Sequence, residues 1–376
     1  MIEAASRMRL AAERELEALV AVSTPSGDRD GAEECVALAI AFLPTEADVE
    51  RVDCSTPDHA PDLVGRLRGS GTKRLALLGH LDTVVAHRAH RPLGRDGDRL
   101  TGSGAVDMKG GVALALALMR ELAERPQLYA EAAILLVNDE EWRTAPFGHA
   151  ARFAGFDACL CFEAGQRAAG GEEAVIVKRK AAATLRVEAH GRSAHSGSAP
   201  ELGRSALLAL ATVAQIVAAR SDAAGPDRLT AVPTIMHSGD AFNVVPAHGE
   251  LLCDLRADRL EAFAPVLAVI PKEHDDVSLD PTMMRAWPGM DSGEATAAVL
   301  ADASERLGRA IIGAERGGAS DASHLAAGGI ELTIDGLGPR GGGAHTPDEW
   351  VSAESLHSRA EVALAVTAAL LGSDPR

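Results

Sequence analysis

Three runs of apolar residues in the first half of the chain predict buried strands: 75–85, 132–137 and 158–162. Each run leads into side chains that can bind a metal ion or carry a proton: His80 and Asp82, Glu140 and Glu141, and Glu163. In open α/β sheets, ligands bind at the edge where the carboxyl ends of the strands lie. The pattern therefore predicts that these side chains meet at one edge of a sheet.

Two glycine-rich turns add further candidates. Asp107 lies in the turn 101–111, directly before an apolar helical pattern. His345 lies in the turn 337–347, which follows a short predicted strand. Because glycine lets backbone segments approach closely, we expect both side chains to lie near strand ends as well.

Helical patterns alternate with the strands and predict a mostly parallel sheet with helices on both faces. A central segment has a different rhythm, βαββαβ: strand 182–189, helix 201–220, strands 229–237 and 249–256, helix 259–269 and strand 276–279. That order is typical of a ferredoxin-like unit. We therefore expect an α/β catalytic domain, formed by 1–180 and 289–376, with a ferredoxin-like domain inserted at 181–288.

Composition excludes several classes of partner. The 376 residues include 37 Lys and Arg against 54 Asp and Glu, a net charge of −17, and only 3% are aromatic. An acidic chain with few aromatic rings does not suit nucleic acid or an anionic membrane. We expect small molecules as its partners.

Cysteine usage and hydropathy bear on location. Five cysteines without a CxxC pair argue against disulfides and against a thiolate zinc site. Charged residues interrupt the first twenty positions, so no secretory signal is expected. No apolar run approaches the roughly 20 residues that span a bilayer. The sequence thus predicts a soluble, cytoplasmic protein.

Imidazole and carboxylate ligands without cysteine suit Zn²⁺, Co²⁺ or Mn²⁺ in a catalytic site. Two such ions, about 3.5–4 Å apart, need a bridging carboxylate, and Asp107 is the candidate. Asp82 can fix the tautomer of His80, and one of Glu140 and Glu141 can bind metal while the other acts as a general base. Taken alone, a His-x-Asp motif is usually a hydrogen-bonded surface pair, and an acidic run is usually a solvated helix start. Their joint occurrence favours the metal site.

The order of these motifs closely resembles the M20 family of di-zinc metallopeptidases, and most of all its glutamate carboxypeptidase branch. The resemblance covers essentially the whole chain and rests on eight segments: 79–82, 104–111, 139–141, 162–164, 193–200, 243–246, 317–321 and 343–346.

The resemblance implies a ligand set. Asp107 would bridge two zinc ions, His80 and Glu163 would complete one metal site, and Glu141 and His345 would complete the other. The glutamate at position 163 is similar to that of carboxypeptidase and deacylase members, whereas aminopeptidase members usually carry aspartate there.

The resemblance also implies roles around the metals. Glu140 would be the general base and Asp82 the partner of His80. The inserted domain would be a lid that forms a homodimer, and its His195 would stabilise the oxyanion in the partner subunit's site. Asn243 and Arg256 would hold the substrate carboxylate.

Two departures from the family pattern bear on specificity. Trp142, Arg143 and Thr144 replace a Gly-Ser stretch after the acidic pair. Trp287 occupies the place of a second arginine at the border of the lid, with Arg285 two residues earlier. Arg285 and Trp287 are therefore candidate substrate contacts, and packing at the hinge is the alternative for Trp287.

Together these features predict a di-metal metallocarboxypeptidase that cleaves an amide next to a free carboxylate. An N-acyl amino acid deacylase, such as one acting on acetylornithine, is the nearest alternative because it shares the catalytic groups. A non-catalytic homologue that binds amino acids is the second alternative.

Overall fold

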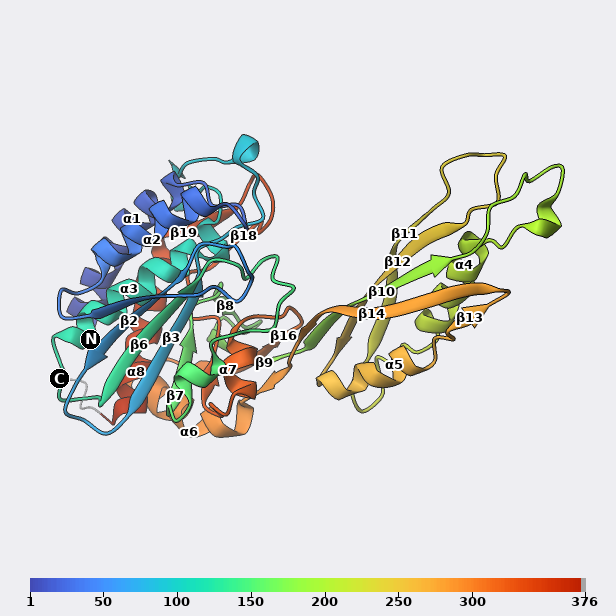
Figure 1. Cartoon of the computed structure of the whole chain (residues 1–376). Helices are drawn as coiled ribbons and strands as arrows, with labels where there is room; N and C mark the ends of the chain where they lie inside the picture. The colour runs from blue at the N-terminus through green and yellow to red at the C-terminus, as the bar shows by residue number, and fades with distance from the viewer. Residues whose placement is uncertain (373–376) are drawn as a thin grey trace. The chain divides into compact units, whose positions relative to one another are not determined.

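The computed structural model describes residues 1–372 and divides into two compact units (Figure 1). The first unit comprises Met1–Lys178, Asp291–Arg316 and the chain from Ser320 onward. The second unit comprises Arg179–Met290 with Gly317–Ala319. The predicted insert, 181–288, falls within the range of the second unit.

A six-stranded mixed sheet forms the centre of the first unit. Its order is β1 (Asp48–Val52), β2 (Asp62–Arg68), β6 (Glu131–Val137), β3 (Arg74–His80), β7 (Ala158–Cys161) and β17 (Thr333–Ile334). Strand β3 runs parallel to β6 and β7, and β17 runs parallel to β7, whereas β1 and β2 are antiparallel additions. The predicted α/β class is confirmed, with a parallel half that holds the functional strand ends.

The apolar runs form central strands of this sheet. Such strands are covered on both faces, so nearly all of their residues are apolar and buried. Every residue of β6 is buried, as are residues 75–80 of β3. The described part of the first unit also contains the helices α1 (Ile2–Ala21), α2 (Arg29–Phe42), α3 (Gly110–Ala123), α6 (Gly293–Leu307), α7 (Ala322–Ala327) and α8 (Ala353–Leu371). Helix α3 packs on β3 and β6, and α1 packs on α3 and α8. One hydrophobic core joins α1, α2, α3, α6 and α8 to the central strands.

Within residues 1–372, smaller sheets and short helical turns lie in the connections between the main elements of the first unit. One sheet has the order β15 (Met290–Asp291), β9 (Glu173–Arg179) and β16 (Ile311–Arg316), with β8 (Gln166–Arg167) paired to β9. The other has the order β18 (Gly341–Gly342), β19 (Trp350–Ser352), β5 (Arg99–Thr101) and β4 (Gly94–Asp96). The turns are η1 (His87–Ala89), η2 (Ala105–Lys109) and η3 (Ala150–Phe153).

The second unit is an antiparallel five-stranded sheet with helices. The sheet order is β11 (Thr230–Ser238), β12 (His248–Ala257), β10 (Ala181–His190), β14 (Val277–Trp287) and β13 (Glu273–His274). The helical elements are η4 (Pro200–Leu202), α4 (Ala206–Ala218), η5 (Leu260–Phe263) and α5 (Ala264–Ala268). Alternate residues of β10 are buried in a separate core, and the others face outward.

Two predicted boundaries in this unit were wrong. Helix α4 begins at Ala206 rather than at Glu201, because the Ser205 hydroxyl caps it by accepting the Leu208 N–H at 3.3 Å. The last strand, predicted as 276–279, extends to Trp287 because it pairs with residues 182–190 of β10. Within residues 1–372, helices long and apolar enough to cross a membrane are absent.

Candidate metal centre

The parallel strands bring the predicted ligands to one edge of the sheet. Strand β3 ends at His80, the segment after β6 carries Glu141, and the segment after β7 carries Glu163. Asp107 lies in η2, directly before α3, and His345 lies in the loop between β18 and β19. All five predicted metal ligands therefore lie close together.

Asp107 is the central carboxylate of this cluster. Its Oδ1 lies 3.2 Å from His80 Nε2, and its Oδ2 lies 3.1 Å from His345 Nε2. Glu163 Oε1 lies 3.8 Å from the His80 nitrogen, and Glu141 Oε2 lies 3.2 Å from the His345 nitrogen. Two groups of ligand atoms result, each within 4.8 Å, and Asp107 belongs to both.

The donor set fits a catalytic metal centre. Nitrogen and oxygen donors without thiolate suit Zn²⁺, Co²⁺ or Mn²⁺. Three carboxylates face two imidazoles, an excess of negative charge that a cation would offset. The His80 side is buried, whereas the side chain of His345 is 53% exposed, so the cluster is accessible on the His345 side.

The ionisable groups of the cluster shift one another's pKa values. Burial opposes ionisation of His80, yet Asp107 and Asp82 raise its pKa well above the usual value. Asp107 and Glu141 raise the pKa of His345 to about 10. Burial disfavours the Asp107 carboxylate, but the two imidazoles lower its pKa. The cluster therefore stabilises cationic groups around a charged Asp107.

Asp82 contacts the cluster through both its backbone and its side chain. The Nδ1 of His80 lies 3.0 Å from the backbone oxygen of Asp82 and 3.4 Å from its carboxylate. The Asp82 carboxylate accepts the backbone N–H groups of Glu140 and Glu141, at 3.1 Å each. Donation from Nδ1 leaves Nε2 of His80 as the ligand atom, while the carboxylate positions the acidic pair.

Glu140 is buried beside the cluster. Burial raises its pKa well above the usual value; His80 opposes this shift, and the charges of Asp321 and Glu163 add to it. A carboxylate with a raised pKa accepts a proton more readily at neutral pH, as a general base must. This environment suits the role predicted for Glu140.

Glu349, which no sequence pattern marked as part of the site, fixes the turn that carries Asp107. Its buried carboxylate accepts three backbone N–H groups, from Gly104 at 2.9 Å, Val106 at 2.8 Å and Asp107 at 2.9 Å. Burial raises the pKa of Glu349 to about 7, against the effect of these bonds. Its sequence context, a Pro-Asp-Glu stretch, reads as a solvated turn and gives no signal of burial.

Replacing Glu349 by glutamine is expected to weaken metal binding. The amide keeps one oxygen for Val106 and Asp107 but sets an NH₂ group against the Gly104 N–H. Loss of such support for a ligand typically lowers metal affinity by about 10–100-fold. Competition with a chelator measures the change. Glu354→Gln, an exposed change near the start of α8, is the control, and equal affinity in both variants would contradict the assignment.

A buried ion triad, also missed, anchors the segment after β6. Arg143 is 1% exposed; its Nε and Nη2 bind Asp139 Oδ1 at 2.9 and 2.6 Å, and its guanidinium binds both oxygens of Asp321. Asp139 also accepts the backbone N–H and the hydroxyl of Thr56. The departure at 142–144 thus places an arginine in the interior and leaves Trp142 exposed at the surface.

The other predicted site residues belong to the second unit. The Nδ1 of His195 accepts the N–H groups of Gly197 and Ser198 at 3.1 Å each, which places the proton of a neutral imidazole on Nε2. Arg256 pairs with Asp254 at 3.0 Å. Asn243 is exposed.

Trp287 is buried in the second unit. It is only 2% exposed, and the Arg285 guanidinium lies 4.5 Å from the ring centroid. This burial favours the alternative of packing at the hinge for Trp287, and its contact with a substrate stays a prediction. Arg285 is engaged with this ring.

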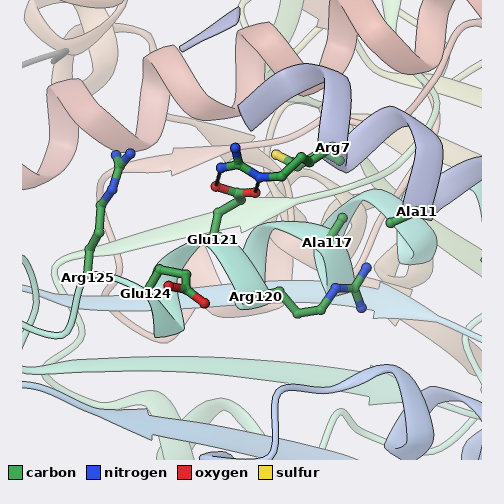
Figure 2. A pocket seen from close by; sticks show the side chains of 8 residues that line it. Arg7, Ala11, Ala117, Arg120, Glu121, Glu124 and Arg125 are labelled. Carbon is green, nitrogen blue, oxygen red and sulfur yellow. Dashed lines mark hydrogen bonds and ion pairs between the residues drawn. The ribbon is translucent and has the colours of Figure 1, made fainter. Parts of the chain in front are cut away.

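A cavity of about 690 Å³ lies between α1 and α3 and involves none of the predicted site residues (Figure 2). Arg7 and Glu121 form a bidentate ion pair across the cavity, with N–O distances of 3.0 and 2.7 Å. Arg120 binds Glu15 at 2.9 Å. These paired charges join two helices and indicate packing rather than catalysis.

The fold and the cluster define a candidate metal-dependent hydrolase. The chain belongs to peptidase family M20/M25/M40, whose profile matches residues 76–369. The predicted family is therefore confirmed, and with it the prediction of a hydrolytic enzyme.

The relatives include both a carboxypeptidase and a deacylase. Carboxypeptidase G2 from Pseudomonas sp. is 28% identical, covering 96% of this chain and 89% of its own. A succinyl-diaminopimelate desuccinylase from Gluconobacter oxydans is 27% identical, covering 81% and 83%. Among solved structures, the M20 metallo-carboxypeptidase Sso-CP2 from Sulfolobus solfataricus has a TM-score of 0.73 at 13% identity, covering 96% and 99%. That last similarity concerns the fold alone.

Proposed function

We propose that the chain is a carboxypeptidase that uses two metal ions, Zn²⁺ or else Co²⁺ or Mn²⁺, to cleave an amide next to a free carboxylate. The observation that carries the proposal is the position of Asp107, with each oxygen facing a different imidazole. His80 and Glu163 would hold one ion, and Glu141 and His345 the other.

The residues of the chain have distinct roles in this mechanism. Metal ions held by these residues would supply Lewis-acid polarisation of the scissile carbonyl and would lower the pKa of a bound water to about 7. Glu140 takes the proton of the attacking water and returns it to the leaving amine. The Asp82 carboxylate keeps Glu140 in place by accepting the backbone N–H of Glu140. His195 donates its Nε2 proton to the developing oxyanion.

The second unit is proposed as a lid and as the homodimer interface. By resemblance, its His195 would serve the partner subunit's site, and Asn243 with Arg256 would bind the substrate carboxylate. The Arg256 guanidinium makes a bidentate pair with the Asp254 carboxylate. It suits the proposed role because it can pair with a substrate carboxylate in the same bidentate way. A cytoplasmic location is part of the same proposal.

The deacylase alternative rests on the relatives. Desuccinylases match the chain at 27–31% identity, though the carboxypeptidase match covers a larger share of it. Metal-loaded protein should therefore be assayed on a panel of peptidyl and folate-like glutamates beside N-acetyl and other acyl amino acids, with Glu140→Ala as the inactive control. Preference for a single acyl group over a peptide would replace the carboxypeptidase assignment by deacylation.

Arg256→Gln is expected to lower kcat/KM for substrates with a free carboxylate. A lost hydrogen bond to a charged group costs about 1.5–3 kcal/mol, or roughly 10–150-fold. Arg259→Gln is the matched control, because Arg259 is exposed and pairs with Asp227. Similar kcat/KM values for the two variants would refute the role of Arg256 and leave the hydrolytic mechanism untouched.

A further inference from the structure

Two histidines of the second unit face each other across neighbouring strands. His190 ends β10, His248 begins β12, and the two are directly paired in the register of the sheet. Their Nδ1 atoms lie 3.4 Å apart. Both side chains are exposed, so a dissolved ion can reach them.

The separation of the two nitrogens matches that of two ligands on one tetrahedral ion. Nitrogen ligands about 2.0–2.1 Å from a tetrahedral Zn²⁺ lie about 3.3–3.4 Å from each other. Asp280 Oδ2 lies 3.6 Å from the opposite nitrogen, Nε2, of His190. A carboxylate on that side favours the proton on Nε2 and leaves Nδ1 with a lone pair for a metal.

The surrounding charge also favours a cation. The next row on the outward face of the sheet places Glu188 between Glu250 and Asp280. Arg186 pairs with Glu188 and Glu250. Three carboxylates against one guanidinium leave a net negative field beside the two imidazoles, which attracts divalent ions.

We propose that His190 and His248 form a surface metal site on the second unit, which takes a divalent transition ion of the Zn²⁺ class and completes its shell with water. This site shares no residue with the cluster at Asp107, because all of its residues belong to the second unit. Its existence does not depend on the proposed function.

His190 ends β10 and His248 begins the antiparallel β12, so two chain segments leave the same end of the sheet at this site. Figure 1 shows the two strands. Residues 191–196 and 243–247 continue the ladder beyond the histidines, through bonds from Gly191 N to Ala247 O at 2.6 Å and from Ser196 N to Asn243 O at 3.0 Å. One segment carries His195 and the other Asn243. An ion bound by His190 and His248 would hold these two segments together. Its effect on catalysis rests on the roles proposed above for His195 and Asn243.

Metal counting tests the site. Purified full-length protein is dialysed against increasing free Zn²⁺, and bound zinc is measured by mass spectrometry for the wild type, His190→Gln and His248→Gln. The wild type is expected to hold one more ion per chain than either variant. His274→Gln is the matched control, because His274 Nε2 also lies 3.6 Å from a carboxylate, Asp275, but pairs with Val277 rather than a histidine.

The outcomes separate the site from the catalytic proposal. Equal zinc content in all four proteins would overturn the site, whatever the activity. Hydrogen exchange at 191–196 and 243–247 tests the consequence: Zn²⁺ should slow it in the wild type and in His274→Gln, and leave it unchanged in His190→Gln. If zinc bound at the site without slowing this exchange, the inference that the ion holds the two segments together would be wrong.

Discussion

Replacing Glu140 by glutamine is expected to lower kcat by about 10²–10⁴-fold, the usual contribution of a positioned general base. The amide has nearly the shape of the carboxylate but cannot take the proton of the attacking water. The backbone N–H of residue 140, which binds Asp82, is unaffected by the change. Steady-state kinetics on the best substrate of the panel measures the effect.

Metal content distinguishes this role from ligation. Glu140→Gln should keep its bound metal, whereas Glu141→Gln should lose part of it, because Glu141 Oε2 lies 3.2 Å from His345 Nε2 and belongs to a group of converging ligand atoms. If Glu140→Gln lost metal as readily as Glu141→Gln, Glu140 would be a ligand instead of the base.

Replacing Arg143 by methionine is expected to destabilise the first unit by about 3–5 kcal/mol, because it leaves the buried carboxylates of Asp139 and Asp321 without their cation. Unfolding in urea, followed by tryptophan fluorescence, measures the loss. The same loss should displace the segment that carries the acidic pair, so metal affinity should fall as well.

Two comparisons make the Arg143 result specific. Arg152→Met breaks an exposed pair with Glu50 and should cost about 0–1 kcal/mol. Adding Asp139→Asn and Asp321→Asn to Arg143→Met removes the unpaired charges and should recover part of the stability. A loss for Arg143→Met no greater than that for Arg152→Met would show that the triad is not important for stability.

The sequence predicted most of the cluster because its signals are local. His80 and Glu163 each follow an apolar run, and a buried parallel strand is recognisable from such a run alone. Parallel strands place their carboxyl ends together, so the convergence followed without knowledge of distant contacts.

Two residues that support the cluster, Glu349 and Arg143, could not be predicted, because each has partners that are remote in the chain. Glu349 binds the turn at Asp107, and Arg143 binds Asp321; nothing near either residue marks it as buried. Trp287 shows the same limit, since only its observed burial separates packing from substrate contact. Local patterns reveal ligands, whereas buried polar networks require the folded structure.

The order of the segments along the chain also governs how the protein is made. The second unit lies between two parts of the first, so a ribosome completes residues 179–290 before it adds His345 and Glu349. At about 5–20 residues per second, Asp107 waits roughly 10–50 s for these partners. The nascent first unit therefore exposes an unfinished ligand cluster during synthesis, while the second unit already has every strand it needs to fold.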